Sequence, residues 1–170
     1  SPAVADLNGD GNLEIIFASL NGNLHAVSIT DGNDIAGFPY DLGMGSWNGP
    51  IVADIDSDAE PEILVGTLGG NIVAVNNDGT LVFERSVGGQ VKTTIVVSDL
   101  DGDENPEIIF GNSLGNLYVV DNQGNDLDNF PLDIGSTIES TPILADMDND
   151  GSVDMIFGDN AGYLHSVGID

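Results

Sequence analysis

Residues 6–14 read Asp6-LNGDGNL-Glu14, and this acidic nine-residue loop pattern recurs along the chain. The later copies are Asp54-IDSDAEP-Glu62, Asp99-LDGDENP-Glu107 and Asp146-MDNDGSV-Asp154, at spacings of 45 to 48 residues. An internal repeat of this length is typical of proteins that stack one structural unit many times. We therefore expect the chain to consist of four similar units.

The sequence around each loop repeats as well. An apolar stretch precedes the loop, a second follows it, and a glycine falls eight positions after the ninth residue, ahead of a third apolar stretch. In the first unit these stretches are Ala3–Ala5, Ile15–Phe17 and Leu24–Val27, with Gly22 between the last two. Short β-branched runs bounded by Gly, Asn and Asp indicate strands. A weaker fourth strand is expected at Phe38–Leu42 and at Phe130–Ile134.

Four short strands in about 45 residues are typical of a β-propeller blade. The sequence therefore predicts an all-β fold, a single array of four-stranded antiparallel propeller blades over residues 1–170. The approximate blades are residues 1–48, 49–92, 93–139 and 140–170. A β-sandwich is the alternative, but it does not require a near-identical unit at a fixed period.

The fourth unit stops after its third predicted strand, so about 3.75 blades are present. An unpaired strand edge is an aggregation hazard. We therefore expect the segment to belong to a larger propeller, or to be completed by a strand from a neighbouring chain. The second possibility predicts self-association through the open blade edge.

Oxygen-bearing side chains occupy positions one, three, five and nine of every loop. A tightly curled loop can direct alternate side chains at one centre, and a cage of six to eight oxygens suits calcium. Position seven would add a backbone carbonyl. The sequence thus predicts up to four Ca²⁺ ions, one per loop, with these candidate ligands: Asp6, Asn8, Asp10, Asn12 and Glu14; Asp54, Asp56, Asp58, Glu60 and Glu62; Asp99, Asp101, Asp103, Asn105 and Glu107; Asp146, Asp148, Asp150, Ser152 and Asp154.

The charge balance supports a cation in these loops. The chain has 29 acidic and 2 basic residues, a formal net charge of −27. Positions one, three, five and nine supply 15 of the acids, and crowded carboxylates repel by roughly 1 kcal/mol or more per pair. The alternative interpretation is a set of solvated acidic turns, since Asp, Asn and Gly are ordinary turn residues. Four copies in register favour the metal.

The loops differ at position six. It is Gly11 and Gly151 in the first and last copies but Ala59 and Glu104 in the middle two. If position six needs a positive φ, a residue with a Cβ atom is disfavoured there. We therefore expect the second and third loops to be distorted, or to bind metal less tightly than the others.

The pattern D-x-[DN]-x-D-x-x-x-[DE] between two strands resembles the FG-GAP/VCBS repeat family, which includes the calcium-binding blades of integrin α-subunit propellers. The resemblance spans essentially the whole chain. It implies propeller blades, calcium in the loops between strands, a secreted or cell-surface location, and a role in adhesion or recognition. The partner it implies is an extracellular protein or glycan.

Composition excludes several other functions. With Arg85 and Lys92 as the only bases, the chain offers no basic patch for nucleic acid or anionic membranes. The absence of cysteine excludes disulfides, zinc–thiolate sites and thiol nucleophiles. No apolar run approaches membrane-spanning length. No catalytic motif stands out, so a non-enzymatic module is predicted. The alternatives are a self-assembling subunit of a surface filament or layer, and a fragment of a propeller-type polysaccharide lyase.

Five aromatic or histidine side chains need comment. His25 and His165 occupy equivalent strand positions and are interpreted as partly exposed strand residues rather than a metal or catalytic pair. Trp47 lies in a glycine-rich connector. It could stack on a sugar, but aromatic packing between blades is the expectation, and the same holds for Tyr40 and Tyr163.

Overall fold

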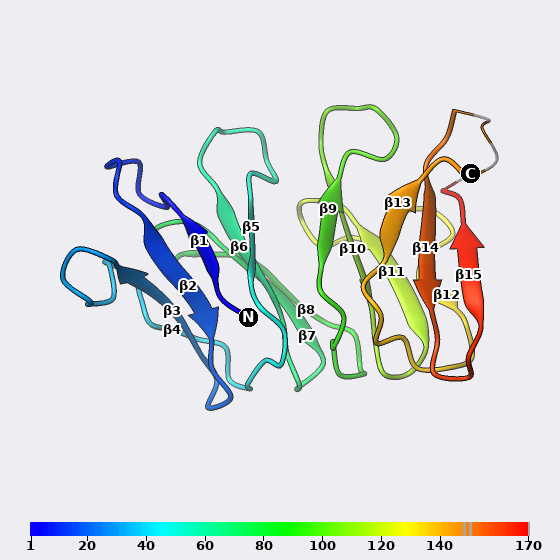
Figure 1. The fold of residues 1–170 in the computed structure, drawn as a ribbon, viewed down its shortest axis with the longest axis horizontal. Helices are drawn as coiled ribbons and strands as arrows, with labels where there is room; N and C mark the ends of the chain where they lie inside the picture. The colour runs from blue at the N-terminus through cyan, green and yellow to red at the C-terminus, as the bar shows by residue number, and fades with distance from the viewer. Residues whose placement is uncertain (148, 150, 170) are drawn as a thin grey trace.

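The computed structural model describes residues 1–147, 149 and 151–169, and this part of the chain is all-β (Figure 1). Three sheets have four antiparallel strands in chain order. They comprise β1 (Ala3–Ala5), β2 (Glu14–Ala18), β3 (Asn23–Ser28) and β4 (Tyr40–Asp41); β5 (Ile51–Ala53), β6 (Glu62–Gly66), β7 (Asn71–Val75) and β8 (Leu81–Ser86); and β9 (Val96–Ser98), β10 (Glu107–Gly111), β11 (Asn116–Val120) and β12 (Leu132–Asp133).

The fourth sheet has three strands, β13 (Ile143–Ala145), β14 (Asp154–Gly158) and β15 (Leu164–Val167). The four sheets follow one another along the molecule in chain order (Figure 1). This is a partial β-propeller, as the repeat predicts. The described residues include no helix that is long and apolar enough to cross a membrane.

The first three strands of each blade lie where the apolar stretches predict them, and the turn glycines Gly22, Gly70, Gly115 and Gly162 all have positive φ. The fourth strand is less regular. β4 and β12 have two residues each, whereas β8 has six. Pro39 and Pro131 lie directly before β4 and β12. Proline has no N–H to donate, which confines it to strand ends and edges.

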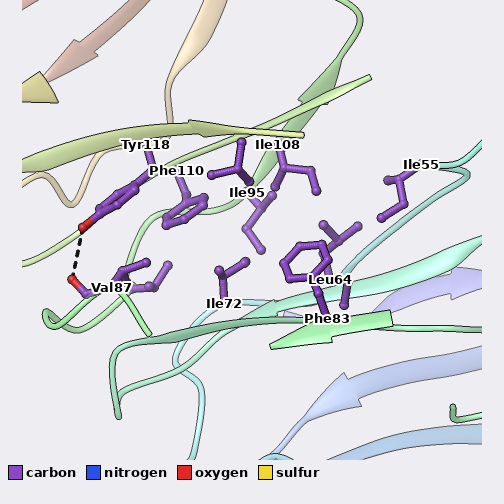
Figure 2. Close-up of a cluster of buried hydrophobic side chains, with 12 residues drawn as sticks. Ile55, Leu64, Ile72, Phe83, Val87, Ile95, Ile108, Phe110 and Tyr118 are labelled. Carbon is purple, nitrogen blue, oxygen red and sulfur yellow. Dashed lines mark hydrogen bonds between the residues drawn. The ribbon is translucent and has the colours of Figure 1, made fainter. Parts of the chain in front are cut away.

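The hydrophobic core lies between neighbouring blades. One cluster joins blades 2 and 3 and contains Leu64, Ile72, Phe83, Ile108 and Phe110 (Figure 2). Two further clusters join blades 1 and 2 and blades 3 and 4. Strands β6 and β10 are buried along their whole length, because both of their faces pack against a neighbouring sheet. Each central blade is therefore held from both sides.

Candidate metal sites in the acidic loops

Strand register closes each acidic loop. The residue directly before position one pairs with position nine, in the pairs Ala5↔Glu14, Ala53↔Glu62, Ser98↔Glu107 and Ala145↔Asp154. The nine residues therefore begin and end at adjacent points of the same two-stranded ladder. The first three loops and the described part of the fourth lie along one edge of the molecule, at the top of Figure 1.

Backbone N–H groups hold the carboxylates at both ends of the loop. One oxygen of position nine accepts a hydrogen bond from the N–H of position two, at 2.9 Å for Glu14, 2.9 Å for Glu62, 2.8 Å for Glu107 and 3.1 Å for Asp154. Oδ2 of position one accepts from the N–H of position six, at 2.9 Å for Asp6, 3.0 Å for Asp54, 3.2 Å for Asp99 and 3.1 Å for Asp146. Both side chains are thereby fixed in orientation.

Positions three and five are held in the same way. In the first loop Asn8 accepts a hydrogen bond from the N–H of Asp10, and Asp10 accepts one from the N–H of Asn12. The second and third loops repeat both bonds. In these three loops the backbone of position seven is therefore held against the side chain of position five. Asp148 and Asp150, the predicted ligands at positions three and five of the last loop, lie outside the described residues.

The held carboxylates leave oxygen atoms without a partner. Glu14, Glu62 and Glu107 are only 1%, 1% and 4% exposed. In the first loop, Asp6 Oδ1 and Glu14 Oε1 are buried and accept no hydrogen bond. A buried acceptor without a partner costs about 1–3 kcal/mol, and more when it is charged. A cation between these two oxygens would supply the missing interaction.

The second and third loops bring carboxylates together. Oxygens of Asp54, Asp56 and Asp58 lie within 4.8 Å of one another, as do oxygens of Asp99, Asp101 and Glu107. Burial, together with the nearby aspartates, raises the pKa of Glu62 from 4.5 to about 7. Burial is also the main cause that raises the pKa of Glu107. The donor set is hard, anionic and convergent, and it fits a hard divalent cation.

The four loops share the same backbone conformation at positions four and six. Position six has positive φ in every copy, at 84° for Gly11, 70° for Ala59, 72° for Glu104 and 94° for Gly151. The expected distortion of the second and third loops is therefore wrong, whereas their affinity for metal stays a prediction. Position four is also left-handed, in Gly9, Ser57, Gly102 and Asn149. The sequence analysis did not predict this second left-handed position. Position four is Gly, Ser or Asn in every loop, and this preference for turn residues was the signal that could have indicated it.

The left-handed backbone predicts opposite effects for two small substitutions. Ala59→Gly should stabilise the protein by about 1 kcal/mol, because glycine adopts positive φ without a Cβ penalty. Gly11→Ala should destabilise it by a similar amount, although nothing lies within 4 Å of the added Cβ. Urea denaturation of both variants checks this. Equal and same-sign changes would mean that φ at position six does not control stability.

The histidines occupy partly exposed strand positions, as predicted. His25 stacks on Phe17 with ring centroids 4.8 Å apart and contacts Asp34, and His165 stacks on Phe157 at 5.2 Å and contacts Asp159. In the third blade Tyr118 stacks on Phe110 at the same cross-strand position. These side chains therefore pair within a blade.

The predicted packing of aromatic rings between blades fails for two of the three side chains. Trp47 is 69% exposed and Tyr163 is 68% exposed. Tyr40 does pack, as a partly buried member of the cluster between blades 1 and 2. Trp47 lies in the connector between β4 and β5, outside the strands of either sheet.

Comparison with known families agrees with this architecture. A model of FG-GAP-like repeats matches residues 6–65, and a model of the lambda-carrageenase β-propeller domain matches residues 62–140. The fold defines a β-propeller repeat protein. The two matches, with the repeated acidic loop, support an FG-GAP-type repeat family for this chain. A search of the curated proteins found no match.

Several solved structures share this fold at low sequence identity. BBS1N, solved in complex with ARL6DN, has a TM-score of 0.72 and 12% identity, over 99% of this chain and 53% of its own. BamB from Moraxella catarrhalis has a TM-score of 0.64 and 17% identity, over 96% and 48%. The V. cholerae biofilm matrix protein Bap1 has a TM-score of 0.63 and 22% identity, over 96% and 30%. The chain thus spans about half or less of these structures, and the likeness shows the fold alone.

Proposed function

We propose that this chain is a calcium-binding, non-catalytic recognition module of a secreted or cell-surface protein. The observation that carries the proposal is the repeated loop in which backbone N–H groups hold the carboxylates of positions one and nine. In the first loop this leaves Asp6 Oδ1 and Glu14 Oε1 buried and without a partner. A solvated acidic turn has no need of buried, unpaired carboxylate oxygens.

Calcium is the cation that suits these loops best. It accepts six to eight oxygen ligands in flexible geometry, whereas magnesium keeps several waters and uses few protein ligands. Positions one, three, five and nine would contribute side-chain oxygens, and position seven its backbone carbonyl. Four such ions would reduce the formal negative charge of the chain from −27 to −19.

The proposed role of the metal is to rigidify the edge of the propeller. Each loop joins the first two strands of a blade, so an ion in the loop ties these strands together. Calcium sites of extracellular modules are tuned to roughly 10⁻⁴–10⁻³ M. The extracellular location rests on the FG-GAP-type repeats and on the acidic composition.

Thermal unfolding tests the calcium proposal. A ligand at 100 times its dissociation constant stabilises the folded state by about 2.7 kcal/mol per site. In a domain of this size each kcal/mol corresponds to about 2–4 °C in the melting temperature. We expect the melting temperature to rise by about 10 °C or more between excess chelator and saturating calcium. An unchanged melting temperature would refute the proposal.

The match to the lambda-carrageenase propeller domain favours one second candidate, a catalytic part of a polysaccharide-degrading enzyme. Incubation with a panel of acidic polysaccharides separates the two, because an enzyme would release short products and a recognition module would not. The supply of two basic side chains favours the recognition module.

A further inference from the structure

A cleft lies at the end of the blades away from the acidic loops. It has a volume of about 310 Å³ and is lined by Trp47, Asn48, Lys92 and Glu139. These residues belong to the connectors that lead into β5, β9 and β13, and each of those strands then runs into an acidic loop. The cleft and the loops therefore lie at opposite ends of the same strands, with the connectors along the bottom of Figure 1.

Three successive blades contribute to this cleft through one position of the repeat. Trp47, Lys92 and Glu139 each lie seven residues before position one of the following acidic loop. The repeat thus brings together an indole, an ammonium and a carboxylate at equivalent places. Nζ of Lys92 donates a hydrogen bond of 3.0 Å to Oε1 of Glu139, across the boundary between two blades. This bond holds the pKa of Glu139 below its usual value.

Asn48 departs from the pattern of its equivalents. At the next repeat position Thr93 and Ser140 use their hydroxyls to bond the backbone of Gly111 and Gly158. In the connector before β5 this structural role passes to Ser46, whose hydroxyl donates to the carbonyl of Gly66 at 2.7 Å. The Asn48 carbonyl accepts a hydrogen bond from the Ser46 hydroxyl, but the Asn48 side chain does not take the structural role, and its buried Nδ2 has no hydrogen-bond partner.

We propose that this cleft binds an uncharged saccharide, with a sugar ring stacked on Trp47. The negative face of an indole ring attracts the positively polarised C–H groups of a pyranose. Asn48, Lys92 and Glu139 offer both donors and acceptors for sugar hydroxyls at the side of the ring. A cleft of about 310 Å³ lies at the small end of ligand pockets, which suits one or two sugar units.

Charge selects a neutral ligand. Lys92 is already paired with Glu139, and the chain carries a formal charge of −27, so an anionic sugar would be repelled. A cationic ligand is disfavoured because the ammonium of Lys92 lines the same cleft. This inference rests on the proposed recognition function and gives it a site and a ligand class.

Trp47 makes the test direct, because it is the only tryptophan in the chain. Titration of the calcium-loaded protein with a panel of neutral oligosaccharides, built from glucose, galactose, mannose, xylose and N-acetylglucosamine, is followed by tryptophan fluorescence and calorimetry. We expect a saturable change with at least one neutral sugar. Trp47→Ala should weaken the calorimetric affinity at least tenfold while the melting temperature stays unchanged.

Tyr163→Ala is the matched control, because Tyr163 is equally exposed but lies outside the cleft. It should bind the sugar as the parent protein does. The inference is overturned if no neutral sugar binds up to about 10 mM, if only anionic polysaccharides bind, or if Trp47→Ala binds as tightly as the parent. Because calcium stabilisation is measured separately by melting, loss of the sugar site alone leaves the calcium proposal standing.

Discussion

Glu62→Gln is expected to destabilise the protein in calcium and to stabilise it in chelator. In calcium the variant would lack one of the proposed charged ligands of the second loop, so the affinity of that site should fall at least tenfold. In chelator the ionised carboxylate of Glu62 destabilises the folded protein, because burial and the neighbouring aspartates raise its pKa to about 7. Glutamine can still accept the hydrogen bond from the N–H of Ile55.

The sign of the chelator effect can be followed with pH. A carboxyl group whose pKa is higher in the folded state than in the unfolded state binds more protons when folded. The metal-free protein should therefore lose stability as pH rises from about 4.5 to about 7. In Glu62→Gln this contribution to the loss should be absent. Melting curves of both proteins across this range provide the measurement.

Glu60→Gln serves as the control from the same loop. The carboxylate of Glu60 is exposed and accepts a hydrogen bond from Asn77, and position seven is expected to offer calcium only its backbone carbonyl. Its substitution should leave calcium affinity within about twofold. Equal losses in Glu60→Gln and Glu62→Gln would show that general negative charge, rather than a defined ligand, governs the site.

Phe110→Ala is expected to lower the free energy of unfolding by about 3–5 kcal/mol, in calcium and in chelator alike. Phe110 is fully buried in β10, within the cluster that joins blades 2 and 3 (Figure 2). Its ring stacks on Tyr118 at 5.0 Å, and Tyr118 Oη donates to the carbonyl of Val87. The substitution leaves a cavity and removes the support of Tyr118.

Urea denaturation measures this effect, with Leu20→Ala as the control. Leu20 is exposed, so its truncation should change stability by no more than about 0.5 kcal/mol. If Phe110→Ala costs less than about 1 kcal/mol, the contact between blades 2 and 3 does not carry the fold. A large cost seen only in calcium would instead place the stability in the metal sites.

Much of the fold could be predicted because the sequence repeats. In every blade the apolar runs, the acidic loop and the turn glycine follow one another in the same order. The same strand assignment therefore fits four separate stretches of the chain. The ladders Ala5↔Glu14 and Ala53↔Glu62 then follow from the spacing. The candidate ligands were also predictable, since side chains at positions one, three, five and nine share one pattern of oxygen atoms.

What the sequence could not predict depends on contacts that the preferences of single residues do not describe. The shape of the second and third loops is maintained despite Ala59 and Glu104, because N–H bonds to Asp54 and Asp99 hold position six in place. The conformational preference of alanine and glutamate, which disfavours positive φ, had predicted distorted loops instead. The exposure of Trp47 likewise depends on where its connector passes, and the cleft exists only because three blades meet. Neither feature can be predicted from the sequence of a single repeat.

The number of calcium ions bound per chain tests the central claim most directly. Equilibrium dialysis across 0.01–10 mM calcium should show saturable binding of more than one and up to four ions, as the tuning range of such sites predicts. Magnesium at the same concentrations should not displace them. Binding of no calcium over this range, or binding that never saturates, would contradict the claim that the acidic loops are metal sites.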